Sequence, residues 1–384
     1  MAQVSIQSCK DYEVEQIMAC VEAGLRPIGG MQKFVLPGQS VLLKINLIGP
    51  KKSEKAATTH PEFVRAVGRL VSAAGGKVFI GDSSGGAIAG MAPTKKSFTV
   101  SGIEQMANEE GFTIVNFDEV GPLQVENPEN FTKDLFITKA VMDVDVVINL
   151  PKMKTHSMGV YTGAVKNLYG AIPGLRKAKY HKEAPNPEVF GEVLADIHCA
   201  INNMPLHIMD GIVSMQGEGP TAGEPYPAEK ILISTDPLAL DRIAIEMMGI
   251  VPERVNILNA AIKRGIGVWE RREIEVIGEF KVLKGYKLPK GYQSNVVRDY
   301  SKVKNVIDFF KVVPSVNKSK CVNCNSCVDS CPVGAIDRTT KLIDYKRCID
   351  CLCCHELCMV EAVDLKSKNQ FVRVVRAVSS MFYK

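Results

Sequence analysis

Nine of the twelve cysteines in this sequence lie in one short stretch, between Cys321 and Cys358. The first run, "CVNCNSCVDSCP", has the spacing C-x2-C-x2-C-x3-C-P, and the same cysteine spacing fits four of the five cysteines in "CIDCLCCHELC". This spacing brings three thiolates to one cubane iron–sulfur cluster and directs the fourth thiolate to a second cluster. A zinc site is the weaker alternative, because zinc usually binds separated pairs of ligands.

The spacing predicts two [4Fe–4S] clusters whose ligands cross between the two runs. The expected ligands are, for the first cluster, Cys321, Cys324, Cys327 and Cys358 and, for the second cluster, Cys348, Cys351, Cys354 and Cys331. Cys353 does not fit the spacing. We interpret it as a small buried residue beside a cluster, and a redox-active spare thiol is the alternative.

The stretch from Lys318 to about Leu365 resembles a bacterial-type ferredoxin module that binds two [4Fe–4S] clusters. The resemblance implies two pseudo-symmetric halves, each with a short strand pair and a small helix. It makes "AID" and "LIDY" strands in the link between the halves. The sequence departs from the family pattern at Met359, where a proline usually follows the last cysteine, and this departure concerns the local turn and not the number of ligands.

Composition and charge indicate an ordinary soluble globular protein, and the formal net charge of +5 gives little reason to expect nucleic acid as a partner. The start of the sequence lacks the basic and apolar regions of a signal peptide, and no run reaches the roughly 20 apolar residues of a membrane span. Clustered cysteines also indicate metal binding in a reducing compartment. We therefore expect a cytoplasmic location and no transmembrane segment.

Upstream of the cysteines, short aliphatic runs alternate with helical patterns, which predicts an α/β domain with a largely parallel sheet. The expected strands include 41–46, 77–82, 112–117, 144–151, 206–211, 231–237 and 273–278. The expected helices include 59–76, 102–111, 187–203 and 238–249, with Thr59 as the N-cap of the first. The predicted fold class is a layered α/β domain followed by a small ferredoxin-like α+β iron–sulfur domain.

Four segments are expected along the chain. They are the α/β domain 1–280, a lysine-rich linker or docking segment 281–317, the iron–sulfur domain 318–366 and a basic amphipathic helix 367–384. The last segment has five basic residues and no acidic one, so it could lie on an anionic membrane surface. An apolar stripe at a terminus more often packs against its own protein, which is the interpretation that we prefer.

Polar and charged residues follow several predicted strands, at the sheet edge where α/β proteins gather their ligands. The densest block is "PKMKTHSMGVYTGAVKNLYGAIPG", and the predicted catalytic residues within it are Lys152, Lys154, His156 and Lys166. The predicted substrate-binding residues are Lys44, Asn46, His60, Asp82, Ser83, Ser84, Asn167, Asp210 and Glu218. The alternative interpretation of the block is a solvated surface loop.

A cationic pocket of this kind suits a carboxylate, a phosphate or an enolate-like intermediate. His156 is a candidate proton donor because imidazole ordinarily titrates near neutrality. The turn "GDSSGG" could bind an anion through its amides. No G-x-G-x-x-G motif or P-loop lysine stands in the right context, so nucleotide binding has no support.

A second resemblance rests on "KINL", "THPEFVRAVGRL", "GDSSGG", "INLPKMKTHSMGVYTGAVKNLYGAIPG", "MDGIVSMQGEGP" and "DPLALDRIAIEMMG". Together these stretches, which span most of residues 40–250, resemble family three-six-two of the domains of unknown function. The resemblance implies the fold and a fusion to a ferredoxin module, and no settled reaction. The family is also distantly similar to the N-terminal domain of nickel-dependent lactate racemases, which leaves room for an additional unknown cofactor such as nickel or a flavin.

These observations favour an iron–sulfur oxidoreductase of a kind suited to anaerobic metabolism. A soluble low-potential electron carrier would supply electrons, through two [4Fe–4S] clusters, to a small anionic organic substrate in the cationic pocket. The alternative is a non-catalytic electron-carrier or cluster-bearing adaptor subunit, whose basic side chains form a docking face. Polyanion binding is a third hypothesis, which only the lysines support.

Overall fold

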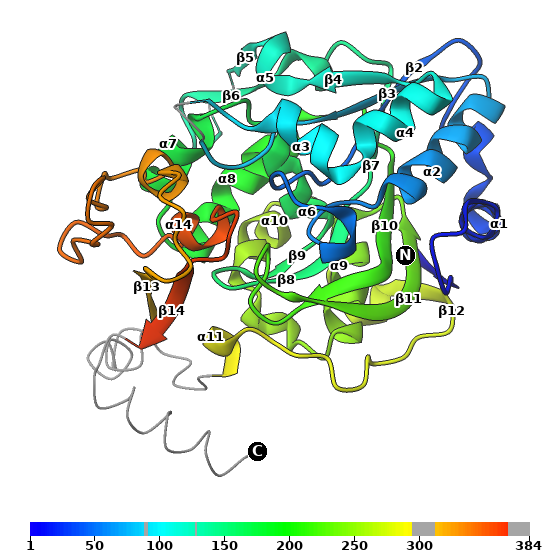
Figure 1. Cartoon of the computed structure of the whole chain (residues 1–384). Coiled ribbons are helices and arrows are strands. Elements are labelled where there is room, and N and C mark those ends of the chain that lie inside the picture. The colour runs from blue at the N-terminus through cyan, green and yellow to red at the C-terminus, as the bar shows by residue number, and fades with distance from the viewer. Residues whose placement is uncertain (88–90, 127–128, 294–311, 368–384) are drawn as a thin grey trace.

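One ten-stranded, largely parallel sheet forms the centre of the molecule (Figure 1). The computed structural model describes residues 1–87, 91–126, 129–293 and 312–367. Along the main path the strand order is β12-β1-β11-β10-β7-β2-β3-β4, and the pair β8–β9 adjoins β10. The strands from β10 through β7, β2 and β3 to β4 are parallel, whereas β11 runs antiparallel to β1 and β10.

The bounds of the strands in this sheet follow the chain. They are β1 (Ala2–Ser8), β2 (Ser40–Lys44), β3 (Lys77–Asp82), β4 (Thr113–Asn116), β7 (Val146–Asn149), β8 (Lys152–His156), β9 (Val160–Thr162), β10 (Leu206–Gln216), β11 (Glu224–Ser234) and β12 (Ile274–Gly278). A separate antiparallel pair joins β5 (Pro122–Val125) and β6 (Leu135–Thr138). The predicted α/β class is confirmed by this arrangement.

Helices cover both faces of the sheet. One layer holds α1 (Val14–Leu25), α2 (Pro61–Ala73), α3 (Thr94–Ser101) and α4 (Ile103–Glu110). The other layer holds α6 (Ala164–Asn167), α8 (Pro187–Ala200), α9 (Pro237–Met247) and α10 (Asn259–Lys263), with α5 (Phe117–Val120) and α7 (Arg176–Glu183) nearby. In β2, Val41 and Leu43 pack on the first layer and Leu42 on the second. Both faces are buried, which explains why this strand reads as a continuous apolar run.

The helix after β2 differs from the prediction at its first turn, because His60 and not Thr59 is the N-cap. The His60 Nδ1 atom accepts a hydrogen bond from the Glu62 N–H at 3.2 Å. The Thr59 hydroxyl instead accepts from the Asn46 N–H and donates to the Leu150 carbonyl, both at 2.8 Å. Thr59 therefore ties together the segments after two strands, and the prediction of Thr59 as the cap was wrong.

The block that begins at Lys152 is not a solvated loop. It forms the hairpin β8–β9 and the short helix α6, and all five residues of β8 are buried. The strand β8 runs parallel to β10, with Lys152 opposite Asp210. The sequence pattern missed these strands, because alternating lysines do not look like buried positions.

The iron–sulfur module spans the described residues 312–367 and lies beside α7 and α8 in Figure 1. It contains α13 (Ser326–Asp329), α14 (Cys353–Glu356) and the antiparallel pair of β13 (Val312–Val316) and β14 (Val363–Ser367). Its halves repeat every 27 residues, because Cys321 precedes Cys348 by this interval. The left-handed residues Asn323 and Asn325 recur at the same interval, as Asp350 and Leu352. Two equal loops of this kind are what two equal ligand sets require.

The expected strands "AID" and "LIDY" are reduced to one antiparallel bridge between Ile336 and Ile343. The Asp337 carboxylate accepts hydrogen bonds from the Thr339 and Thr340 N–H groups at 3.1 and 2.6 Å. These bonds close a turn directly after the bridge, so the chain has no room for longer strands.

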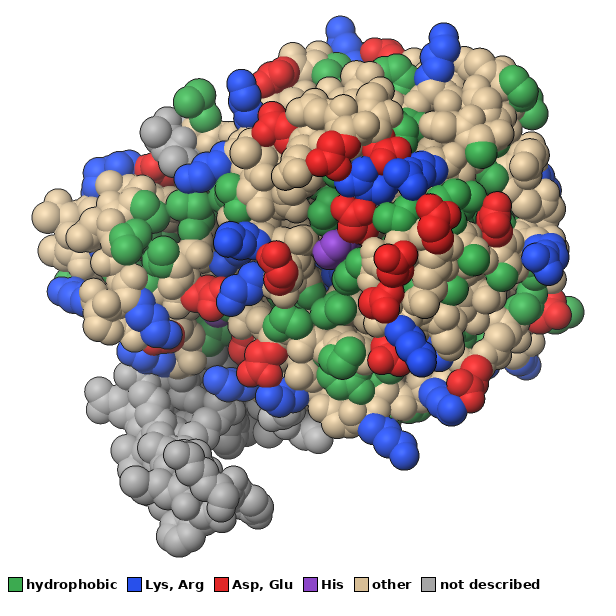
Figure 2. Space-filling model, turned by 45° about the vertical axis from the view of Figure 1, so that its right-hand side comes forward, with side chains coloured by type: hydrophobic (Ala, Val, Ile, Leu, Met, Phe, Trp, Pro, Cys, Tyr) green, Lys and Arg blue, Asp and Glu red, His purple; other side chains and the backbone are tan. Residues whose placement is uncertain are grey.

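Two predicted segments lie largely outside the described residues. These are the helix 367–384 and, within the linker, residues 294–311, whereas the linker end at α11 (Lys290–Gln293) is described. Within the described ranges, no helix is both long enough and apolar enough to cross a membrane. On the face shown in Figure 2, basic and acidic side chains are interspersed and do not separate by sign.

Candidate functional site

A cavity of about 890 Å³, part of it open to solvent, lies where the sheet meets the iron–sulfur module. Its sheet side includes Asn46, Asp82, Ser83, Lys154, Lys166, Asn167 and Lys177. Its module side consists of Asp329, Ser330, Cys353, Glu356 and Leu357. The residues on the sheet side follow β2 and β3 or belong to β8 and α6, so the cavity occupies the carboxyl edge of the parallel strands, as predicted for a ligand site.

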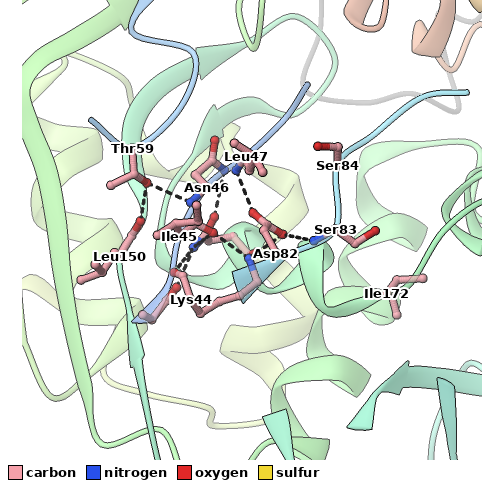
Figure 3. A network of polar contacts seen from close by, with 12 residues as sticks. Lys44, Ile45, Asn46, Leu47, Thr59, Asp82, Ser83, Ser84, Leu150 and Ile172 are labelled. Carbon is pink, nitrogen blue, oxygen red and sulfur yellow. Dashed lines mark hydrogen bonds and ion pairs between the residues drawn. The ribbon is translucent and has the colours of Figure 1, made fainter. Parts of the chain in front are cut away.

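A buried ion pair holds the two loops that begin this wall (Figure 3). The Lys44 ammonium lies 3.0 Å from the Asp82 carboxylate and donates to the carbonyls of Ile45 and Asn167. Asp82 also accepts hydrogen bonds from the Leu47 and Ser83 N–H groups, both at 2.7 Å. Burial lowers the pKa of Lys44 and raises that of Asp82, while their mutual attraction opposes both shifts. With its contacts filled, Lys44 serves to position the loops.

Lys154 is held in the cavity wall by two acceptors. Its ammonium donates to the Asn46 Oδ1 atom and to the Ala57 carbonyl, both at 2.7 Å. Asn46 in turn donates to the Asn167 Oδ1 atom at 2.8 Å. Burial, followed by the nearby charges of Lys166 and Lys152, lowers the pKa of Lys154 well below its ordinary value. Lys154 therefore contributes a fixed polar wall more than a free positive charge.

Lys177 on α7 also lines the cavity, and the sequence did not single it out. Its ammonium donates to the Ser83 hydroxyl at 2.6 Å and to the carbonyls of Ile172 and Ser84 at 2.5 and 3.4 Å. Burial lowers the pKa of Lys177 to about 8. Lysines on an amphipathic helix are usually solvated, so only the packing of α7 against the loop after β3 could identify this one.

Ser84 lies just behind the cavity wall. Its N–H donates to the Thr94 hydroxyl at 2.9 Å. Its own hydroxyl is buried without a hydrogen-bond partner among the described residues. The turn after β3 therefore carries an unsatisfied polar group beside the wall.

Lys166 differs from the other lysines of the wall. In the described part of the chain, no hydrogen bond or ion pair of its ammonium is found, although the group borders the cavity. Burial lowers its pKa, and the negative charge of Glu356 opposes this effect. The hydroxyl of Thr162, another wall residue, is also buried without a partner among the described residues. Lys166 and Thr162 can therefore both donate to a bound anion.

The helix that carries Lys166 begins on a buried carboxylate. Asp241 of α9 accepts hydrogen bonds from the Ala164 and Val165 N–H groups at 2.6 and 3.1 Å and from the Tyr161 hydroxyl at 2.8 Å. A Cβ atom at Gly163 would lie 1.9 Å from the Tyr161 hydroxyl, so only glycine fits there. The one available signal for Asp241 in the sequence was a charged residue at an apolar position of an amphipathic helix.

His156 lies behind the wall and does not line the cavity. Its Nδ1 atom accepts hydrogen bonds from the Met158 and Gly159 N–H groups at 3.2 and 3.0 Å, so its proton resides on Nε2. Nε2 is 3.4 Å from the Glu356 carboxylate, and Glu356 separates His156 from the cavity. Burial, with a smaller effect from Lys166 and Lys154, lowers the pKa of His156 well below its ordinary value.

Four predicted residues lie elsewhere. Lys152 and Asp210 form a buried ion pair at 2.7 Å, and both bind the Tyr12 hydroxyl, at 2.8 and 2.9 Å. The His60 ring stacks on Tyr12 with a centroid distance of 3.6 Å. Glu218 accepts hydrogen bonds from the Ser157 hydroxyl and the Lys290 N–H. None of the four lines the cavity, because the twist of the sheet and the path of β10 separate them from it.

The structure brings the cysteines together in the two predicted sets. One small cavity, of about 310 Å³, is lined by Cys321, Cys324, Cys327 and Cys358, and another, of about 320 Å³, is lined by Cys331, Cys348, Cys351, Cys353 and Cys354. Burial and then the thiols of its own set raise the pKa of Cys327 to about 11. The Sγ atoms of Cys331 and Cys358 accept hydrogen bonds from the N–H groups four residues later, at 3.2 and 3.1 Å.

The residues present therefore fit two cubane clusters. Within the described ranges, no three His, Cys, Asp or Glu side chains converge closely enough for a single metal ion. A cubane needs wider spacing, because each of its four irons takes one thiolate. Backbone N–H groups directed at the ligand sulfurs are also a feature by which proteins adjust the potentials of such clusters.

Comparison with known proteins identifies two families along the chain. A family described as "Domain of unknown function (DUF362)" matches residues 41–246, and a "4Fe-4S binding domain" matches residues 314–337. The chain is 36% identical over 265 residues to the thylakoid-associated protein sll1697 of Synechocystis sp. (strain ATCC 27184 / PCC 6803 / Kazusa). That match covers 68% of this chain and 79% of the relative.

Two solved structures are more remote matches. The lactate racemase apoprotein from Thermoanaerobacterium thermosaccharolyticum is 16% identical with a TM-score of 0.41, and the match covers 65% of this chain and 56% of that chain. A protein from Thermotoga maritima is 13% identical with a TM-score of 0.37, and the match covers 62% of this chain and 60% of that chain.

Proposed function

Because the chain belongs to the DUF362 family and also carries a 4Fe–4S binding domain, we propose that it is an iron–sulfur oxidoreductase acting on a small anionic organic substrate. One observation carries this proposal: a single cavity has the sheet edge as one wall and the cluster-binding module as the other. A protein that only carried electrons would have no need to place its module over a cavity lined by the sheet.

Two cubane clusters fit the cysteine sets, and when bound they supply single electrons at low potential. The proposal takes these electrons from a soluble low-potential carrier. Leu342 and Val322 of the module are 63% and 61% exposed, and such apolar side chains suit transient docking of a partner. The same exposed side chains are the observation that favours the alternative, a non-catalytic electron-carrier or adaptor subunit.

The substrate is proposed to be anionic because Lys166 and Thr162 point unsatisfied donors at the cavity. A cation of this kind acts more strongly in a site with little water than at the surface, since the local dielectric constant is low. Lys154 and Lys177 add fixed positive groups nearby, although their protein partners already occupy them. The substrate is thus expected to present a carboxylate or a phosphate to Lys166.

The proposed reaction is reduction of an activated double bond or carbonyl group of the substrate. It consumes two electrons, which come from the carrier, and two protons, which come from water that enters the open side of the cavity. Lys166 stabilises the negative charge that develops before protonation. His156 keeps the Glu356 carboxylate in place through its Nε2–H and is proposed to support proton delivery at that point.

The test is anaerobic cluster reoxidation. The protein is loaded with iron and sulfide, reduced, and mixed with a panel of small carboxylates and phosphoesters, while the visible absorbance reports the clusters. We expect one class of compound to reoxidise them, and Lys166→Met to slow this reaction at least about 100-fold, the effect expected from removing one charge-stabilising group. The matched control is Lys179→Met, because Lys179 is an exposed lysine on α7 that pairs with Asp134 outside the cavity.

Two results would contradict the proposal. Reoxidation that is equally fast in both variants would exclude the cavity as the reaction site. Stoichiometric zinc, or an iron content far from about eight per chain, would exclude the two clusters.

A further inference from the structure

The two cysteine sets are not equivalent with respect to the substrate cavity. Cys353 lines both this cavity and the one formed by the set of Cys331, Cys348, Cys351 and Cys354. Among the described residues, none lines both the substrate cavity and the one formed by Cys321, Cys324, Cys327 and Cys358. The second ligand set therefore shares a wall with the substrate cavity and the first set does not.

The repeat of the module does not require a cysteine at this wall. Residue 353 corresponds to Ser326 in the other half, 27 residues earlier, and each is the first residue of its short helix. Ser326 donates its hydroxyl to the Leu357 carbonyl at 3.5 Å and leaves the ligand sulfurs alone. The fold thus accepts serine in this position, and the thiol of Cys353 needs another explanation.

The Cys353 thiol interacts with a cluster ligand. Hydrogen bonding with Cys353 is the largest influence on the Cys351 thiol and lowers its pKa to about 7. A hydrogen bond to a ligand sulfur stabilises the more negative, reduced form of a cluster and so raises its reduction potential. Because Cys353 is only 4% exposed, water does not replace this bond.

The same wall carries the unpaired cation of the cavity. Lys166 interacts electrostatically with Cys353 and Glu356 across the cavity wall. A positive charge near a cluster also favours its reduced form. One thiol and one ammonium thus act on the same ligand set from the side where the substrate binds.

We propose that the ligand set of Cys331, Cys348, Cys351 and Cys354 is the one that serves the substrate cavity, and that Cys353 is a positioning residue that raises its reduction potential. The assignment of the cavity to a substrate rests on the proposed function. The effect of Cys353 and Lys166 on one ligand set does not, because it concerns the reduction potential alone.

The test is a redox titration followed by electron paramagnetic resonance, with iron content as the second readout. Cys348→Ser, which alters a ligand, first assigns the signal of the second set. Cys353→Ala and Lys166→Met are each expected to lower the midpoint potential of that signal and to leave the other signal in place, with unchanged iron. Cys353→Ser is expected to restore the wild-type potential, because its hydroxyl replaces the S–H donor. Ser326→Ala is the matched control in the other half and is expected to move neither signal.

The outcomes separate the two proposals. Equal shifts of both signals, a shift of the first set alone, or no shift in Cys353→Ala would overturn the inference. The same follows if Cys353→Ser behaves like Cys353→Ala, since a purely structural effect of the smaller side chain would then explain the result. If the expected shifts occur but no compound reoxidises the clusters, the inference holds and the proposed function fails.

Discussion

At the scale of single residues, four lysines near the sheet edge have the same chemistry and different roles, which their partners decide. Lys44 and Lys152 each face a buried carboxylate at 3.0 and 2.7 Å. Lys154 is held by uncharged acceptors. Lys166 alone among these four has no bonded partner within the described residues and borders the cavity. Removal of each lysine should therefore have a distinct consequence.

Lys152→Met should lower the free energy of unfolding by about 3–5 kcal/mol, because it leaves the Asp210 carboxylate buried without its cation. Lys166→Met should change it by less than about 1 kcal/mol, since this lysine has no ion pair to lose. Anaerobic urea denaturation, followed by far-UV circular dichroism, measures both values. Equal losses in the two variants would show that Lys166 has a buried partner or that the Lys152 pair is not buried.

At the scale of elements, the short helix α6 places the working cation, and α9 places α6. The Asp241 carboxylate takes the first N–H groups of α6 and the Tyr161 hydroxyl, while Gly163 lets these groups approach. Four residues are too few for a helix to form by itself. The position of Lys166 is therefore inherited from a carboxylate that lies 75 residues later in the chain.

Asp241 should also give folding stability a pH dependence of known sign. Burial raises its folded pKa from 3.8 to about 7. Between these values the folded protein binds more protons than the unfolded chain, so the free energy of unfolding falls as the pH rises from about 4 to about 7 and is level above that. The full effect is about 4 kcal/mol by linkage.

Asp241→Asn removes the titrating group and should flatten this slope. The difference in unfolding free energy between the wild type and this variant, measured by urea denaturation at pH 5 and pH 8, checks the prediction. Asp134→Asn, at an exposed carboxylate, is the control and should follow the wild type. A wild-type and Asp241→Asn difference that stays constant with pH would mean that Asp241 is ionised throughout.

At the scale of the whole molecule, the module is both the place for the clusters and half of the cavity. Hydrogen bonds join it to the sheet domain, from the Ala87 N–H to the Ser330 hydroxyl at 2.9 Å and from the Thr221 hydroxyl to the Glu356 carbonyl at 2.5 Å. Its own apolar core is small, and three of the six buried residues in it are cysteines. Without the clusters, such a core cannot stabilise the module.

Removal of iron with a chelator should therefore unfold residues 312–367 and leave the sheet domain folded, since that domain has two large cores of its own. Limited proteolysis with mass spectrometry checks this. The iron-free protein should be cut within the module far faster than the loaded protein, and a fragment of about residues 1–290 should persist. Equal cleavage of the module with and without iron would show that its folding does not depend on the clusters.

Much of the fold followed from local patterns. The run of residues 41–46 was predicted as a strand because both of its faces are apolar, and α8 and α9 were predicted from their periodicity. The pattern missed β8, because buried lysines and a histidine occupy it. It also misplaced the cap at Thr59, since the hydroxyl was needed by two other segments. Local rules failed where polar side chains answer to distant partners.

The sequence by itself determined the cysteine sets, because the spacing of ligands on one short loop is a property of the local chain. It also determined the alternation of strands and helices, for the same reason. Only the tertiary structure decided which polar residues form a site: it separated Lys152, His60 and Asp210 from Lys166, and it brought in Lys177 and Asp241. The physical reason is that a side chain's charge and reach depend on groups that folding places next to it, and those groups lie tens or hundreds of residues away along the chain.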